Sequence, residues 1–196
     1  AATTQGVPSF HDWPDGARAV RLSRPADCTP VCTTELGRTA ALSGEFAARN
    51  AKAIAVSVDS VKDHLRWVPD IAEVAGVDVD FPIIADEDRS VSQAYDMIHP
   101  GEGDTSPVRS VFLIDPSNTV RLTITYPKSV GRNFTEILRA LDALQATDRS
   151  PISTPAEWVP GDRVIVAPAI ATDDARERFA NVDEVKPYLR FADAPA

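Results

Sequence analysis

Short apolar runs alternate with segments of helical periodicity along most of the chain. The apolar runs predict strands at Ala17–Ser23, Ala53–Val58, Phe81–Ile84, Arg109–Ile114 and Thr119–Tyr126. The run AIAVSV is rich in Val and Ile, as in a strand buried in a parallel sheet. Turn-forming residues separate only the last two runs, so these two are expected to pair as an antiparallel hairpin.

Helical periodicity fills the gaps between these runs. One helix is expected to begin near Cys32 and end near Asn50, and another to follow the N-capping residues Asp59 and Ser60. Pro69 predicts a kink or an early stop in that second helix. Further helices are expected at Arg89–Met97 and Phe134–Leu144. The order β-α-β-α-β-α-β-β-α indicates an α/β protein with a thioredoxin-like layered sheet.

The pattern of apolar and turn-forming residues changes after Gln145. A linker-like stretch covers residues 147–155, then one strand is expected at Arg163–Val166 and short helices around 172–179 and 183–186. This divides the chain into a thioredoxin-like domain, 1–146, and a small α+β extension, 147–196. The extension has few apolar residues for a core of its own, so we expect it to pack on the first domain or on a second subunit in a homodimer. The side chains that need such burial are Trp158, Val164, Val166, Phe179 and Tyr188.

Composition narrows the classes of function. The chain has 196 residues, a net charge of -9 and a pI of about 4.8, which disfavours a nucleic-acid partner. No apolar run approaches the roughly 18 residues that a membrane span requires, and residues 1–9 do not resemble a signal peptide. The two cysteines are too few for a disulfide framework, so a reducing, cytoplasmic location is expected.

The position of Cys32 suggests chemistry. It follows Thr29-Pro30-Val31 at the expected start of a helix, where free N–H groups and the helix dipole favour an anion such as a thiolate. The Thr29 hydroxyl can reach the same place. On these grounds alone, a buried structural cysteine explains Cys32 equally well.

The segment Pro25-Ala26-Asp27-Cys28-Thr29-Pro30-Val31-Cys32-Thr33-Thr34-Glu35-Leu36-Gly37 resembles the active site of peroxiredoxins, whose core is Pro-x-x-x-Thr-x-x-Cys. The longer string is similar to the one-cysteine, peroxiredoxin 6 type. The likeness continues in Phe81-Pro82-Ile83-Ile84 and Gly131-Arg132-Asn133-Phe134. It reaches the C-terminal region in Tyr188-Leu189-Arg190.

This resemblance implies a role for each matching residue. Cys32 would attack the peroxide, Thr29 would hydrogen-bond the peroxide and the thiolate, and Arg109 would hold the thiolate and polarise the O–O bond. Without the resemblance, Arg109 would be a surface arginine on a strand. Three more positions match residues that shape or support such a site: Pro25, Glu35 and Arg132.

The implied reaction converts Cys32 to sulfenic acid and needs no metal or other cofactor. The histidines and acidic residues show no metal-ligand spacing. The implied partners are a peroxide, an external thiol or other small reductant, and a second copy of the chain in a homodimer or a larger oligomer.

The chain departs from the family in several places. It starts just after the point where family members have a segment containing Gly-Asp-x-Ala-Pro-x-Phe. Arg24 stands where the family has His, and Cys28 where it often has Phe. Arg18 and Arg21 lie in the expected central strand, where a charge is costly unless paired. Either they pair with acidic groups, or the sequence is imperfect between Pro14 and Cys28.

Two other functions fit the same fold. A thiol-disulfide oxidoreductase could use Cys28 and Cys32, but the thioredoxin pattern is Cys-x-x-Cys and Glu35 occupies the matching position. An oligomeric holdase would need no reactive cysteine. We expect Cys28 to be a small buried residue that does not resolve the sulfenic acid efficiently.

Overall fold

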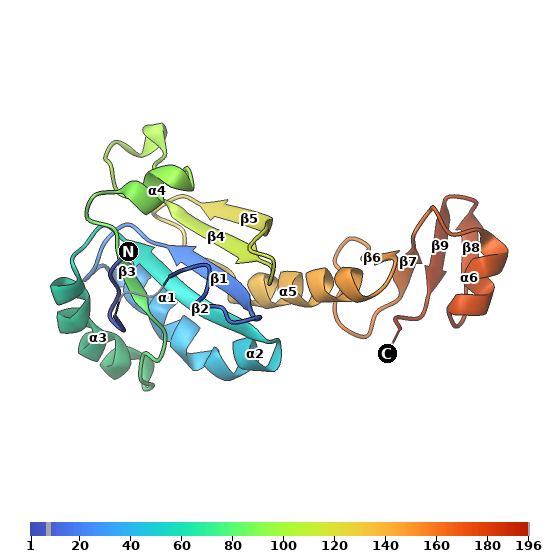
Figure 1. The fold of residues 1–196 in the computed structure, drawn as a ribbon, viewed down its shortest axis with the longest axis horizontal. Helices are drawn as coiled ribbons and strands as arrows, with labels where there is room; N and C mark the ends of the chain where they lie inside the picture. Colours follow the sequence, from blue (N-terminus) through green and yellow to red (C-terminus); the bar gives the residue numbers. More distant parts are fainter. Residues whose placement is uncertain (7–8, 196) are drawn as a thin grey trace. The chain divides into compact units, whose positions relative to one another are not determined.

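The computed structural model describes residues 1–6 and 9–195, which form two compact units, Ala1–Phe134 and Thr135–Ala196 (Figure 1). Each unit has its own sheet.

The first unit is built on a five-stranded sheet. Its strands are β1 (Arg18–Ser23), β2 (Ala51–Ser57), β3 (Ile83–Ala85), β4 (Arg109–Ile114) and β5 (Val120–Tyr126). Their order is β3-β2-β1-β4-β5, with β1, β2 and β3 parallel and β4 and β5 antiparallel to their neighbours. The predicted strands and the predicted hairpin are therefore confirmed. Because β1 lies in the middle, the loop that follows it opens at the centre of the sheet's edge.

Helices connect these strands. They are α1 (Pro30–Ala41), α2 (Ser43–Ala48), α3 (Val61–Ala75), α4 (Ser90–Ala94) and the 3-10 turn η1 (Pro100–Glu102). In Figure 1, α1, α2 and α3 lie below the sheet and α4 lies above it. The single helix expected to end near Asn50 is in fact two helices, because Leu42 leaves the helical conformation between α1 and α2.

Helix α1 packs closely on α3. A Cβ added to Gly37 would lie 2.7 Å from the Cβ of Ala75, so only glycine permits this approach. Helix α3 begins at the cap Ser60, whose hydroxyl accepts the Asp63 N–H, and it ends at Gly76. It runs through Pro69, so the early stop considered from the sequence does not occur.

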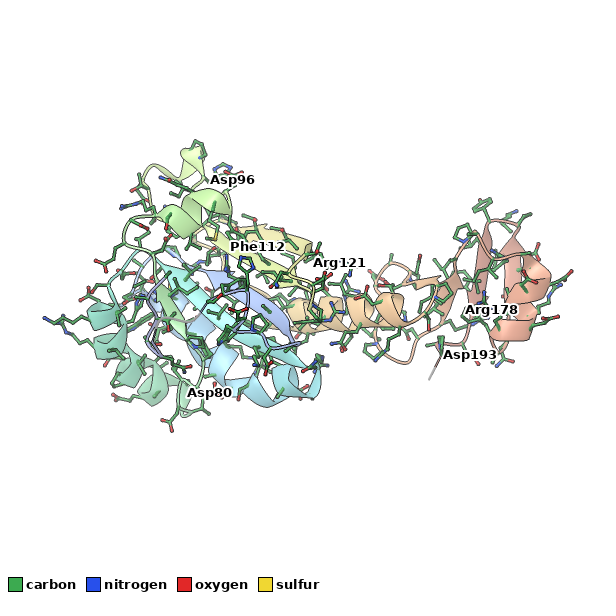
Figure 2. All side chains as sticks on the ribbon, viewed as in Figure 1. Asp80, Asp96, Phe112, Arg121, Arg178 and Asp193 are labelled. Atoms are coloured by element: carbon green, nitrogen blue, oxygen red, sulfur yellow. The ribbon has the colours of Figure 1, made fainter. Side chains whose placement is uncertain are left out.

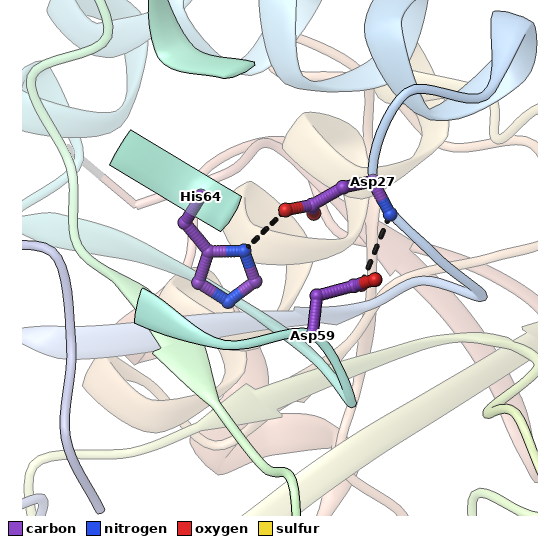
Figure 3. Close-up of side chains that lie close together, drawn as sticks. All are labelled: Asp27, Asp59 and His64. Atoms are coloured by element: carbon purple, nitrogen blue, oxygen red, sulfur yellow. Dashed lines mark hydrogen bonds and ion pairs between the residues drawn. The ribbon is translucent and has the colours of Figure 1, made fainter. Parts of the chain in front are cut away.

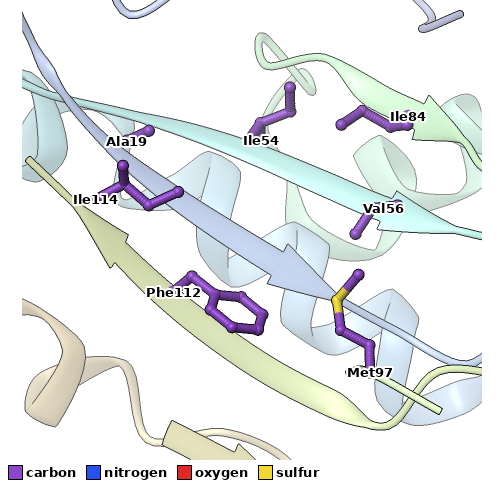
Figure 4. Close-up of a cluster of buried hydrophobic side chains, with 7 residues drawn as sticks. All are labelled: Ala19, Ile54, Val56, Ile84, Met97, Phe112 and Ile114. Atoms are coloured by element: carbon purple, nitrogen blue, oxygen red, sulfur yellow. The ribbon is translucent and has the colours of Figure 1, made fainter. Parts of the chain in front are cut away.

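One apolar cluster fills the space between the sheet and α4 (Figure 4). It is formed by Ala19, Ile54, Val56, Ile84, Met97, Phe112 and Ile114, with Phe10, Trp13, Val91 and Tyr95 against it. Arg21 enters this region from β1 and is 3% exposed. Its guanidinium carbon lies 3.9 Å from the centre of the Phe10 ring and 4.0 Å from that of Tyr95. These two aromatic faces, the hydrogen bond with Tyr95 and the charge of Asp86 therefore compensate this buried cation.

The second unit contains α5 (Phe134–Arg149), which begins at the last residue of the first unit, and a four-stranded antiparallel sheet with α6 (Thr172–Arg178). The strands, in the order β6-β7-β9-β8, are β6 (Ile152–Ser153), β7 (Val164–Val166), β9 (Leu189–Ala192) and β8 (Asp183–Lys186).

Two expectations about this region are wrong. Residues 183–186 form a strand and not a helix, because they pair with β9 across a tight turn. The region also has small cores of its own, one around Trp158 and Val164 and one around Val166. Of the side chains thought to need a partner, Tyr188 is the one that stays largely exposed, at 72%.

Charged side chains line the outside of both units. Asp80, Asp96 and Arg178 are exposed, whereas Phe112 is buried (Figure 2). In the described residues, no helix is long and apolar enough to cross a membrane.

Candidate active site

Cys32 occupies the third position of α1, directly after Pro30 and Val31, and its side chain is fully buried. Proline suits the first helical position because its fixed φ matches the helix and it has no N–H to leave unpaired. The prediction that Cys32 lies in the first turn of a helix is confirmed. The sulfur is thereby placed near the positive end of the helix dipole, which favours the thiolate.

Arg109 reaches this sulfur from β4. Its Nη1 donates to the Cys32 Sγ at 3.2 Å and to the Glu35 Oε2 at 2.8 Å. Its Nε donates to the carbonyl oxygen of Lys128 at 2.7 Å. The Arg109 side chain is 3% exposed, so it is not the surface arginine considered as an alternative. Three acceptors fix the orientation of the buried Arg109 guanidinium. A cation held in this way can stabilise negative charge that develops on a neighbouring atom during a reaction.

Glu35 connects this arginine to a second one. It lies one turn after Cys32 on α1, and its carboxylate accepts from the Arg132 Nε at 3.0 Å, Nη2 at 2.7 Å and backbone N–H at 2.9 Å. Burial lowers the pKa of Arg132 below that of an ordinary arginine, and Glu35 opposes this effect. Glu35 and Arg132 therefore form a hydrogen-bonded ion pair, which holds the two charges in place although both side chains are buried.

The loop before α1 carries the other expected site residues. Thr29 is the N-cap of α1, and its hydroxyl donates to the Ala26 carbonyl oxygen at 3.1 Å. In the described part of the chain, the Thr29 side chain makes no hydrogen bond with Cys32. Pro25 is half-buried and follows Arg24, the first residue after β1.

Cys28 lies in the same loop but is exposed, with a left-handed φ of 53°. The expectation of a buried residue is therefore wrong. Desolvation, together with the negative charges of Asp27, Asp70 and Asp59, raises the pKa of the Cys28 thiol. A neutral thiol is a poor nucleophile, so Cys28 is poorly suited to attack a peroxide or a sulfenic acid.

A buried charged cluster fixes this loop to the neighbouring elements (Figure 3). The Nδ1 of His64 lies 2.7 Å from the Asp27 Oδ2, and the Asp27 N–H donates to the Asp59 Oδ2 at 3.0 Å. Arg24 is fully buried, and its Nη2 lies 2.5 Å from the Asp27 Oδ1. Burial alone would raise the pKa of Asp27, but the hydrogen bond with His64 and the charge of Arg24 lower it overall.

Asp27, Asp59 and His64 together resemble a metal-ligand set, since one possible ligand atom of each lies within 4.8 Å of the others. Sequence spacing gave no sign of this group. The Arg24 guanidinium already faces all three, at 3.2 Å from the His64 Nδ1 and 3.9 Å from the Asp59 Oδ2. A divalent cation would meet that positive charge, so the residues present do not fit a metal. Arg24 is the resident cation of this cluster.

Comparison with known proteins shows the family of this chain. Residues 4–123 match the model of the AhpC/TSA family, and residues 143–181 match the C-terminal domain of 1-Cys peroxiredoxin. A 1-Cys peroxiredoxin of Dictyostelium discoideum is 51% identical over 175 residues, covering 89% of this chain and 73% of the relative. The chain belongs to the one-cysteine peroxiredoxins.

Solved peroxiredoxins confirm the fold. The structure of peroxiredoxin 6 of Arenicola marina has a TM-score of 0.94 and 42% identity, covering 100% of this chain and 94% of that one. A yeast mitochondrial 1-Cys peroxiredoxin has a TM-score of 0.93 and 46% identity, covering 98% and 94%. This peroxiredoxin therefore has the thioredoxin-like fold with a C-terminal extension, and it is a thiol peroxidase that acts through a cysteine.

Sequence reasoning missed the contribution of the loop after β5 and the role of Arg24. The Lys128 carbonyl oxygen that orients Arg109 is a backbone group, so residue type gives no signal for it. In the sequence, Arg24 stands out only as a departure from the family. A buried strand end that carries a cation, with Asp27 three residues later, was the available signal for an ion pair.

Proposed function

We propose that Cys32 is the peroxidatic residue of this enzyme and that Arg109 is its main electrostatic partner. The observation that carries this proposal is the 3.2 Å hydrogen bond from the Arg109 Nη1 to the buried Cys32 Sγ. A guanidinium held against a thiolate stabilises the nucleophile. It also stabilises the negative charge that develops on the leaving oxygen.

In the proposed reaction, the Cys32 thiolate attacks one peroxide oxygen and an S–O bond forms as the O–O bond breaks. The electron pair of the O–O bond leaves on the second oxygen, which takes up a proton and departs as water or an alcohol. Cys32 is oxidised to sulfenic acid and the peroxide is reduced. The hydrogen of the Thr29 hydroxyl is committed to Ala26, so Thr29 would accept the hydrogen bond that the peroxide donates.

Supporting residues keep these groups in place. Glu35 holds Arg109 from α1 and Arg132 holds Glu35 from the loop before α5, so the three charges form one unit. Pro25 would limit the freedom of the loop that leads to Thr29. We propose hydrogen peroxide and organic hydroperoxides as substrates.

We further propose that an external thiol regenerates Cys32, because Cys28 has a raised pKa. The yeast relative is described with glutathione and thioredoxin systems, which makes these the first reductants to test. We also propose a homodimer, supported by the exposed Tyr188 at the β8–β9 turn, and a reducing compartment such as the cytoplasm.

Mass spectrometry after one equivalent of peroxide tests the assignment of Cys32. We expect sulfenic acid, trapped with dimedone, on Cys32 in the wild type and no trapped product in Cys32→Ser. A Cys28–Cys32 disulfide as the first product would instead favour a thiol-disulfide oxidoreductase. An unmodified Cys32 would favour the non-enzymatic holdase.

A further inference from the structure

The loop between β5 and α5, residues 127–133, controls the direction of Arg109. The Lys128 carbonyl oxygen of this loop accepts a hydrogen bond from the Arg109 Nε at 2.7 Å, and Arg132 of the same loop donates to Glu35. Arg109 can therefore reach the Cys32 sulfur only if this loop stays where it is. The backbone contact explains how the loop acts on Arg109, but it does not explain what holds the loop.

The side chain of Lys128 supplies such an attachment. Its Nζ donates to the Asp104 Oδ1 at 2.5 Å, and the Lys128 side chain is only 15% exposed. Asp104 lies between η1 and β4, five residues before Arg109. The same Oδ1 accepts from the Ser106 N–H at 2.7 Å and from the Ser106 hydroxyl at 2.6 Å, so the carboxylate is fixed by its own loop. The hydrogen bond from Lys128 is the largest of the effects that lower the pKa of Asp104 well below its usual range.

We propose that Lys128 is a positioning residue for the peroxidase reaction, because its ion pair with Asp104 ties the segment before β4 to the loop after β5. The first segment leads into β4, which begins at Arg109. The second segment carries the Lys128 carbonyl oxygen that accepts the Arg109 Nε. The proposal rests on the function proposed for Arg109. The Asp104 side chain is 60% exposed, so the effect is modest and sensitive to salt.

The test uses Lys128→Met, which keeps the length of the side chain and removes its charge, together with Asp104→Asn and the double variant. Arg66→Met is the matched control, since Arg66 forms an exposed ion pair with Asp63 on α3. The second-order rate constant of sulfenic acid formation with hydrogen peroxide is measured at low and at high salt. Thermal unfolding of each variant reports any general loss of stability.

We expect Lys128→Met and Asp104→Asn each to lower the rate constant by about two- to fivefold, with no further loss in the double variant. High salt should slow the wild type and Arg66→Met toward the Lys128→Met value and leave Lys128→Met unchanged. Asp104→Asn is decisive about the mechanism. If Lys128 acted by its own charge on the thiolate, removal of the acidic Asp104 would speed the reaction, whereas loss of positioning slows it.

A wild-type rate in Lys128→Met, or a faster reaction in Asp104→Asn, overturns the proposal. A third variant separates this failure from failure of the function proposed for Arg109. If Arg109→Met is slow and Lys128→Met is not, only the positioning role fails. If Arg109→Met reacts as fast as the wild type, both fail. When both proposals hold, Lys128→Met has no further effect on top of Arg109→Met.

Discussion

Replacement of Arg109 by methionine should slow sulfenic acid formation far more than it weakens the fold. The substitution removes the donor at 3.2 Å from the Cys32 Sγ and leaves a side chain of similar length. Loss of one preorganised donor that stabilises developing charge typically lowers a rate by about 100- to 1000-fold, or about 3–4 kcal/mol. We therefore expect a decrease of that size in the second-order rate constant with hydrogen peroxide.

The structure also sets the expected loss of stability. In the variant, Glu35 keeps its hydrogen bonds from Arg132, so no buried carboxylate is left without a cation. The Lys128 carbonyl oxygen loses its partner; a fully buried unsatisfied acceptor costs about 1–3 kcal/mol, and this partly buried one costs less. The folded fraction at room temperature should remain high, which thermal unfolding can verify.

Arg109→Lys is the matched control. An ammonium group keeps the charge but cannot reach Cys32, Glu35 and the Lys128 carbonyl oxygen together as the planar guanidinium does. Its rate should fall between those of the wild type and Arg109→Met. The assay traps sulfenic acid with dimedone at timed intervals and quantifies it by mass spectrometry. A wild-type rate in Arg109→Met would refute the reasoning, as would a loss of rate fully explained by unfolding.

Three further outcomes follow from the geometry. Wild type and Cys28→Ser should progress to sulfinic acid on Cys32 equally under excess peroxide, and accumulation of a disulfide in the wild type alone would show that Cys28 resolves the intermediate. Gly37→Ala should destabilise the protein by about 1–3 kcal/mol, because its Cβ would lie 2.7 Å from the Cβ of Ala75; an unchanged melting temperature would contradict this. Asp27→Asn should lower stability at neutral pH by about 3–5 kcal/mol, since it removes the carboxylate that pairs with the buried Arg24 guanidinium. Because the pKa of Asp27 is lowered by folding, its contribution is present above the ordinary value of 3.8 and lost as pH falls below it, so the gap between variant and wild type should narrow in acid.

Local sequence patterns were sufficient to predict several strands and the position of Cys32 at a helix start. The strands β1, β2, β4 and β5 follow from short apolar runs and turn residues, and the position of Cys32 follows from Pro30 at a helix start. The hydrogen bond between Arg109 and Cys32 joins residues 77 positions apart. Only the family motif, and no local pattern, could predict it.

Other features depend on contacts that no local pattern encodes. The sequence predicts a short helix at 183–186, but these residues pair with β9 and form strand β8. Acidic partners were considered for Arg21, whereas the structure provides the rings of Phe10 and Tyr95, which come from distant segments. The cluster around Arg24 likewise combines side chains from two separate segments.

The full burial of Cys32 has a consequence for the two halves of the catalytic cycle. A peroxide has few atoms and can reach a covered sulfur through small fluctuations of the surrounding side chains. A thiol reductant is larger, so it must wait until the helix start moves away. The close contact at Gly37 anchors α1 one turn further on, which confines that movement to the residues before it. Oxidation should therefore be governed by chemistry and reduction by the frequency of local opening, so conditions that loosen the helix start should accelerate recycling while they slow the attack on peroxide.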